Sequence, residues 1–251
     1  MNRDDILIRL KNESAALLPE STPTFYRDFE AELAWARETF FTHPLALRCQ
    51  DDVLPFLNDR YGHGTTHAKK VAIEAGAIAL AEGLPLGIME ARHLGLLAIL
   101  AGLLHDVCRL EGDHAHRGAD LALIILRDYP LTDEHRTMVA EAIRCHEAFR
   151  DIPLPLDEAA RIVAGALYDA DKFRWGPDNF VTTLWEICNY QEWDICQIAD
   201  RFPAGLQVIE SIRDTFRTPT GQAYGPEFID LGLAMGKHLY QKIQQYCGRA
   251  S

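Results

Sequence analysis

Two histidines and two aspartates, placed far apart in the chain, have the residue types and spacing of a metal site. His105 and Asp106 are adjacent and directly follow the apolar run Leu94–Leu104, while His67 and Asp171 lie at long range on either side. An imidazole beside a carboxylate, joined by one more of each type, is how separate helices converge on one metal ion. The pattern therefore indicates a metalloenzyme.

Two further histidines, His114 and His146, extend this set. Each lies in or next to a predicted helix with apolar neighbours, where an ionisable side chain is costly unless it is paired or bound to metal. Imidazoles with a few carboxylates are the donors expected for Fe, Mn, Zn or Ni, and such a site can hold two ions. Any one of these histidines could instead be a hydrogen-bonded core residue, so the hypothesis depends on the whole set.

The other histidines have simpler interpretations. His116 competes with His114 for the same role, since it lies only two residues further on. His63 follows a glycine at an expected helix start, which makes it a pocket residue at most. His93, His135 and His238 have charged neighbours, which favours solvated surface positions for all three.

The elements that must position these residues are helices. Hydrophobic periodicity is helical almost throughout, and hairpin signals between alternating β-branched runs are missing, so we expect an all-α fold. Helices are expected at about 4–18, 26–41, 44–58, 63–82, 87–107, 115–127, 132–149, 157–173, 180–189, 191–216 and 227–247. The first two should form an N-terminal antiparallel layer. Pro203 and the stretch Thr218–Pro226 are expected to interrupt helices.

Length and composition indicate one large helical domain. The chain has 251 residues and 48% hydrophobic content, which suffices for a sizeable core. We expect an N-terminal layer (1–60), a metal-binding core (61–180) and C-terminal helices of the same domain (181–251). The formal net charge of −12 disfavours long nucleic acid as a partner.

We expect a cytoplasmic protein that does not enter membranes. The most apolar stretch, Leu94–Leu104, is well short of the roughly 20 residues that cross a bilayer, and the N-terminus has no uninterrupted apolar run. The six cysteines are scattered and form no CxxC pair, which is typical of a reduced compartment. Oligomeric state stays open.

The order His, His-Asp, His, His, Asp, in the segments GTTHAKKVA, LLHDVCRL, DHAHRGADLA, AIRCHEAF and LYDADKF, resembles the HD-domain superfamily of metal-dependent phosphohydrolases. The resemblance covers roughly 63–175. It implies a helical bundle, here with additional N- and C-terminal helices, in which His67, His105, Asp106 and Asp171 bind metal.

The same resemblance favours two metal ions. In binuclear members an extra histidine precedes a Gly-Ala pair by four residues and another lies in an AIxxH-like helix, which corresponds here to His114 and His146. Fe or Mn is favoured, with Mg, Ni and Zn as alternatives. The cyclic-dinucleotide branch, with adjacent histidines and a GYP signature, is disfavoured because Cys145 precedes His146 and no GYP follows.

The implied activity is hydrolysis of a small phosphate ester or nucleotide by a metal-activated water. Asp106 would bridge the ions, and Arg109 and Lys172 would hold phosphate oxygens, although either cation could instead be an ordinary salt-bridge residue. Glu147 and Asp169 are candidate acceptors for the ligand imidazoles. Two alternatives remain: a di-iron oxygenase with the same ligands, and a non-catalytic nucleotide-binding regulatory domain.

Aromatic side chains near these segments are candidates for stacking on a base. They are Tyr61, Phe149, Tyr168, Phe173 and Trp175. Aromatic residues at helical spacing are more often part of the core, so the sequence does not identify the substrate.

Overall fold

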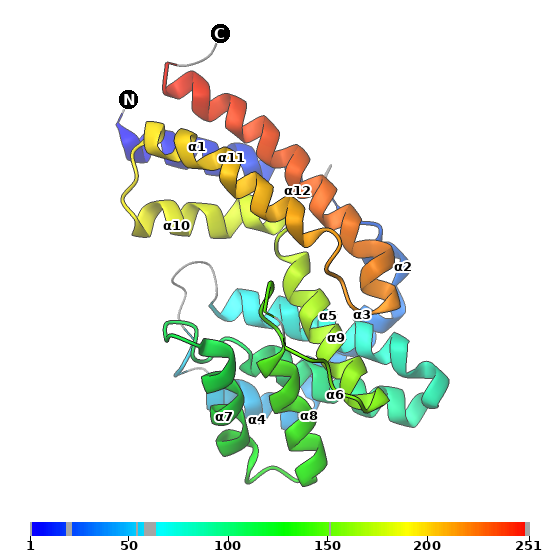
Figure 1. Cartoon of the computed structure of the whole chain (residues 1–251). Helices are drawn as coiled ribbons and strands as arrows, with labels where there is room; N and C mark the ends of the chain where they lie inside the picture. The colour runs from blue at the N-terminus through cyan, green and yellow to red at the C-terminus, as the bar shows by residue number, and fades with distance from the viewer. Residues whose placement is uncertain (1, 19–21, 54, 58–63, 151, 249–251) are drawn as a thin grey trace.

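The computed structural model describes residues 2–18, 22–53, 55–57, 64–150 and 152–248. Within these ranges every regular element is helical, which confirms the predicted all-α class (Figure 1). The α-helices are α1 (Arg3–Leu17), α2 (Phe25–Asp28), α3 (Glu30–Thr42), α4 (Pro44–Val53), α5 (Thr65–Gly83), α6 (Ile88–Leu104), α7 (His114–Leu126), α8 (Asp133–Arg144), α9 (Glu158–Phe173), α10 (Leu184–Tyr190), α11 (Ile195–Ile212) and α12 (Pro219–Tyr246). A 3-10 turn (Leu84–Leu86) precedes α6, and a π-helical segment (Asn179–Thr183) precedes α10.

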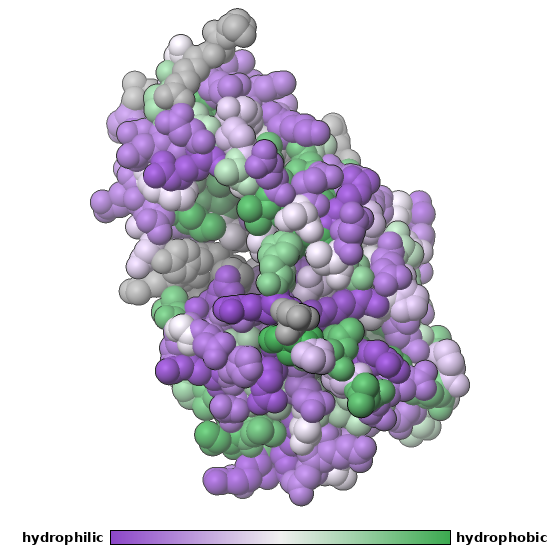
Figure 2. Space-filling model, in the orientation of Figure 1, coloured by the Kyte–Doolittle hydropathy of each residue, from purple (hydrophilic) through white to green (hydrophobic). Residues whose placement is uncertain are grey.

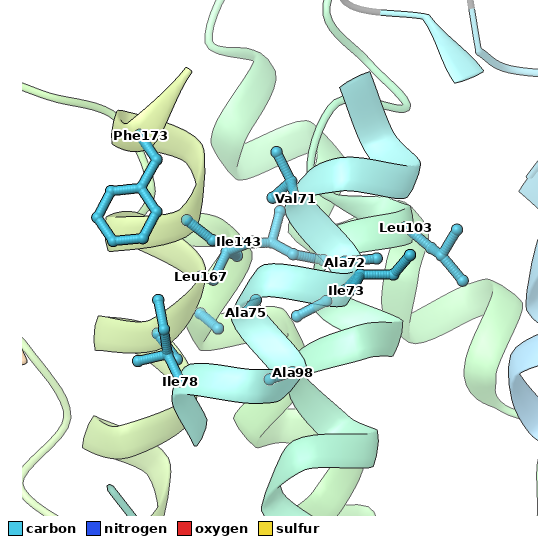
Figure 3. Close-up of a cluster of buried hydrophobic side chains, with 14 of the residues drawn as sticks. Val71, Ala72, Ile73, Ala75, Ile78, Ala98, Leu103, Ile143, Leu167 and Phe173 are labelled. Carbon is cyan, nitrogen blue, oxygen red and sulfur yellow. The ribbon is translucent and has the colours of Figure 1, made fainter. Parts of the chain in front are cut away.

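The core is built around α5, α6 and α9, which pack against one another. The apolar run of α6 is buried on all sides, from Leu94 to Leu104, as expected for a helix at the centre of a large domain. Figure 3 shows part of this core, with Val71 and Ile78 of α5 and Leu167 of α9 among the buried side chains. This packing fixes the two ends of α5 and α6 from which the candidate metal ligands project.

The helices fall into two groups joined by α9. In Figure 1, α4, α6, α7 and α8 lie below, while α1, α10, α11 and most of α12 lie above. The expected N-terminal antiparallel layer is wrong: α1 packs mainly on α12 and the π-helical segment, and α3 packs on α5. The reason is that the apolar face of α1 (Ile6, Leu7, Leu10) meets the upper group, whereas α3 buries Ala36 and Phe40 below. The division at 60 and 180 stays a prediction.

The stretch Thr218–Pro226, expected to be a loop, forms the first turns of α12. Thr218 is the N-cap, with its side chain accepting from the Gly221 N–H, and Pro219 occupies the first turn, where its missing N–H costs nothing. Gly221 is required because a Cβ there would lie 2.0 Å from Asp169 Oδ2. Pro203 is likewise inside α11, which is secured at its start by an Asp194–Gln197 capping box.

Asp169 anchors the chain that enters α12. Its carboxylate accepts from the backbone N–H groups of Arg217 and Thr218, both at 2.8 Å, and from Thr218 Oγ1 at 2.6 Å. Burial raises the pKa of Asp169 to about 6, while the bonds from Thr218 and Arg217 act to lower it. Asp169 therefore does not support a ligand imidazole, and that sequence-based interpretation is wrong.

Replacing Asp169 with alanine is expected to destabilise the protein by roughly 2–4 kcal/mol, because a buried and a part-buried backbone N–H lose their acceptor. The measurement is urea unfolding followed by circular dichroism. Asp169→Asn, which keeps one carbonyl acceptor, should lose less. Equal stability of Asp169→Ala and the wild type would contradict the anchoring role.

Cys196 and Cys247 form a disulfide, with their Cα atoms 5.3 Å apart. Six scattered cysteines without a CxxC pair did not predict this bond, because 51 residues separate the two cysteines and the packing of α11 against α12 brings them together. Cys49, Cys108, Cys145 and Cys188 carry free, buried thiols. None of the helices in the described ranges is long and apolar enough to cross a membrane.

Candidate metal centre

Five segments bring the predicted ligands together where α5, α6, α7, α8 and α9 converge. His67 lies in the first turn of α5, and His105 and Asp106 directly follow α6. His114 opens α7, His146 follows the end of α8, and Asp171 lies in the last turn of α9. All six side chains are buried, although they are histidines and aspartates. Such burial requires partners, and the residues supply them to one another.

The first group of ligand atoms belongs to His67, His105 and Asp171. The two Nε2 atoms are 3.2 Å apart, and Asp171 Oδ1 lies 3.3 Å from that of His67 and 3.8 Å from that of His105. Two donors bound to one ion at about 2.0–2.2 Å lie roughly 3–3.5 Å apart, so most of this spacing suits a common ion.

Asp106 joins the first group to the second, which contains His114 and His146. Its Oδ2 lies 3.2 Å from His105 Nε2 and 3.5 Å from His67 Nε2. Its Oδ1 lies 3.9 Å from His114 Nε2 and 3.8 Å from His146 Nε2. The one carboxylate therefore turns one oxygen toward each group, which is the arrangement of a bridging ligand.

Backbone carbonyls orient two of the imidazoles. His105 Nδ1 donates to Gly102 O at 2.8 Å, and His146 Nδ1 donates to Ile143 O at 2.6 Å. A proton held on Nδ1 leaves Nε2 with a lone pair, and in both residues Nε2 faces the carboxylate cluster. This second hydrogen bond is typical of metal-binding histidines.

Three of these ligand residues have the protonation state that a metal ion requires, namely a neutral imidazole or an ionised carboxylate. Burial and the nearby His105 lower the pKa of His146 to about 3, and burial with Arg109 lowers the pKa of His114, so both imidazoles are neutral at pH 7. Burial acts to raise the pKa of Asp171, but Lys172 and the imidazoles hold it well below its usual range. The carboxylates around His105 outweigh its burial and raise its pKa, whereas metal binding favours the neutral imidazole.

The chemical types of these six ligand residues fit a metal centre. Four imidazoles and two carboxylates form two triads of buried ligand atoms that could hold metal ions. The structure brings together all six residues that the sequence suggested, and it places them in the two groups that a two-ion site needs. The identity of the metal stays a prediction.

His114 and His116 differ sharply in their surroundings. The side chain of His114 is 11% exposed and lies in the second group, whereas that of His116 is 48% exposed and contacts Asp113. His114 Nδ1 lies 3.5 Å from Glu147 Oε1, which gives Glu147 the supporting position suggested for it. His114 Nε2, however, accepts from Arg109 Nη1 at 3.0 Å, so metal binding through this atom requires Arg109 to turn away.

Arg109 and Lys172, the two predicted phosphate-binding cations, both border the site. Arg109 Nη1 lies 3.9 Å from Asp106 Oδ1, and its side chain is 35% exposed. Lys172 is almost fully buried, and its Nζ donates to Asp171 Oδ2 at 2.5 Å. Lys172 therefore neutralises a candidate ligand, a role that its position beside Asp171 alone did not reveal.

An ion network beside the site was missed by sequence reasoning. The Arg174 guanidinium, 7% exposed, contacts the carboxylates of Glu74 and Asp178 and donates to Tyr26 Oη at 3.1 Å. Tyr26 Oη in turn donates to Glu74 at 2.8 Å, and Lys70 contacts Asp178. A signal was present, because Arg174 lies three residues after Asp171, directly after the expected helix 157–173, but Glu74 and Tyr26 come from distant segments.

The solvated surface positions predicted for His93 and His135 are correct only in part. His93 in α6 and His135 in α8 are half-buried, and their Nε2 atoms are 3.1 Å apart. Burial, followed by the charge of His135, lowers the pKa of His93. His238 is exposed, as expected, and His63 lies outside the described residues.

A cavity of about 570 Å³ adjoins the metal-ligand groups. His67, Asp106, His146 and Asp171 lie at one end, and most of the other lining residues belong to the π-helical segment, α10 and α11. Figure 1 shows α10 and α11 above the ligand-bearing helices, and in Figure 2 hydrophobic residues are visible at the level between the two groups. A concave, mostly apolar site with a few convergent polar groups is typical of small-molecule binding.

The predicted aromatic residues divide between this cavity and the core. Phe149 and Trp175 line the cavity, and Phe149 has a left-handed backbone with φ of 61°. Phe173 stacks on Phe228 in the core, and Tyr168 is buried under the Arg217 guanidinium. Tyr61 lies outside the described residues.

Comparison of the chain with protein families, with curated proteins and with solved structures finds no match.

Proposed function

We propose that this protein is a metal-dependent phosphohydrolase that uses two divalent ions, Fe or Mn in the first place, on a small phosphate ester. The observation that carries the proposal is the Asp106 carboxylate, which turns one oxygen to each of two buried histidine groups. The order of these residues in the sequence, which resembles that of HD-domain phosphohydrolases, supports the same activity.

Each ligand-bearing residue has a defined task in this proposal. His67, His105 and Asp171 would hold one ion, His114 and His146 the other, and Asp106 both. Ions held there would supply Lewis-acid stabilisation of the phosphoryl oxygens and a bound water of lowered pKa. The carbonyls of Gly102 and Ile143 keep the His105 and His146 rings fixed, which avoids reorganisation during the reaction.

The two cations would bind and orient the phosphate. Arg109, at the rim of the second group, offers a planar pair of donors that suits two phosphoryl oxygens, and a bound phosphate would draw it away from His114. Lys172 has three N–H donors, of which one is given to Asp171, so others can reach an oxygen in the cavity that it lines.

The test of the activity is phosphate release from p-nitrophenyl phosphate. We expect a chelator to lower the rate by more than about 100-fold and Mn²⁺ or Fe²⁺ to restore it, because a single electrostatic stabiliser is already worth roughly 10²–10³ in rate. His105→Ala should be inactive under all conditions, while His116→Ala, a matched change at an exposed histidine, should retain activity. A rate that is insensitive to the chelator would contradict the proposal.

A di-iron oxygenase is the second candidate, since the same six ligands serve both chemistries. Oxygen uptake that depends on a substrate and on iron, together with no phosphate release, would favour it. Saturable nucleotide binding without either reaction would instead favour a regulatory domain.

A further inference from the structure

The cavity beside the metal centre has two chemically different ends. Four of the candidate metal ligands, with Arg109 and Lys172, form a charged end. The far end is hydrocarbon, and its main side chains are Leu184, Ile187, Ile198, Phe202, Leu206 and Ile209. We call this far end the apolar chamber.

The apolar chamber is a product of the local helix geometry. Ile198, Phe202 and Leu206 are four residues apart in α11, so they share one face of that helix. From the other side, the π-helical segment and α10 supply Phe180, Leu184 and Ile187. π-Helical turns are rare and frequently occur at functional sites, which is consistent with a wall shaped for a ligand.

The hydrocarbon side chains of the apolar chamber offer no hydrogen-bond partner, and the cavity residue Arg201 already has contacts of its own. Arg201 donates to Gln197 O at 3.2 Å and lies over the Trp193 ring at 4.7 Å from its centroid. A purine or pyrimidine buried among the side chains of the apolar chamber would leave its polar edges without such partners, which is costly. A hydrocarbon group entering the same space would remove apolar surface from water at no such cost.

We propose that the site takes phosphate esters of an apolar alcohol, with the phosphate at the metal centre and an aliphatic tail in the apolar chamber. This inference rests on the proposed function for the phosphate end, and on the chamber walls for the tail. Asp106, Lys172 and Phe202 line the same cavity, so one ligand can occupy the phosphate end and the apolar chamber together.

Gly205 offers a direct way to fill the apolar chamber. It lines the cavity from α11, and a Cβ added there meets no atom within 4 Å. Because the residue is exposed and helical, a side chain at this position displaces no packed group and does not strain the backbone. Gly205→Phe is therefore expected to place a large side chain at the chamber wall, and Gly205→Ala is the matched control with almost the same volume as the wild type.

The experiment is calorimetric binding of ethyl, butyl and hexyl phosphonate to the Mn²⁺-loaded full chain. Phosphonates keep the anionic head but cannot be hydrolysed at the P–C bond, so binding is measured apart from turnover. We expect affinity to rise roughly fourfold per methylene, and by more than about 100-fold from ethyl to hexyl. Gly205→Phe should lose at least tenfold for hexyl phosphonate and leave ethyl phosphonate unchanged, while Gly205→Ala should match the wild type.

Ethyl and hexyl phosphonate of equal affinity, or adenosine monophosphate binding more tightly than hexyl phosphonate, would overturn the proposal. An unchanged hexyl affinity in Gly205→Phe would overturn the placement of the tail against α11. Phosphate release from hexyl phosphate is measured in parallel. Length-dependent binding without any release would support the apolar-tail site and contradict the hydrolase, so the two claims fail separately.

Discussion

Replacing Asp106 with alanine is expected to remove both metal ions and to lower phosphate release by more than about a thousandfold. The reason is geometric, because this carboxylate is the one candidate ligand in the described ranges that faces both histidine groups. Losing both ions removes more than a single oxyanion donor, which alone is worth roughly 10²–10³. Elemental analysis and a phosphatase assay on the same preparation provide the measurement.

Single-group variants supply the comparison for Asp106→Ala. His146→Ala should lose the ion of the second group and retain that of the first, whereas Asp171→Ala should do the reverse. His116→Ala should keep both ions, since its side chain contacts Asp113 at the surface. An Asp106→Ala protein that retains full metal content would show that the two groups are held independently, and the bridging role would be wrong.

Replacing Arg174 with alanine is expected to destabilise the fold by roughly 3–5 kcal/mol, the cost of breaking a buried ion pair by removing one partner. Arg174 and Glu74 are both buried, at 7% and 5% side-chain exposure, so the Glu74 carboxylate would be left in the core without its cation. Desolvation already raises the pKa of Glu74, and Arg174 is the largest influence that opposes this. The measurement is the free energy of urea unfolding.

Arg213→Ala is the matched control for this change. Arg213 makes a bidentate contact with the Asp230 carboxylate, with Nη1–Oδ1 at 2.5 Å and Nη2–Oδ2 at 2.8 Å. Both of these side chains are exposed. Exposed pairs contribute about 0–1 kcal/mol, so this variant should be close to the wild type. Similar losses in the two variants would mean that burial does not decide the contribution of Arg174.

Helical periodicity predicted most of the fold, because each helix carries its own apolar pattern. For α5 to α9, most of the expected helix ends lie within a few residues of the observed ones. Leu94–Leu104 is part of a buried helix, as its composition indicated. The predictions failed at proline and glycine. Pro219 and Gly221 suit a helix start once Thr218 caps it and Asp169 holds the preceding backbone. The cap is local, but the contact between Asp169 and Thr218 joins residues 49 positions apart in the sequence.

The candidate site was predictable where one residue type implies one chemistry. Buried histidines and aspartates need partners, so these six residues could be predicted to lie together. The structure brings them together. The roles of Lys172 and Arg174 were not predictable, since a cation next to a ligand can face phosphate, a carboxylate or water, and only packing decides. The apolar chamber could not be predicted from the sequence either, because Leu184 and Leu206 have the same helical hydrophobic spacing as core residues.

The central claim is a two-ion centre, and metal content per chain tests it most directly. Protein purified without a metal-binding tag, and analysed for its elements, should contain about two iron or manganese ions per chain, falling to about one in His114→Ala or His146→Ala. About one ion per chain, unchanged by either substitution, would contradict the account and reduce the site to His67, His105, Asp106 and Asp171.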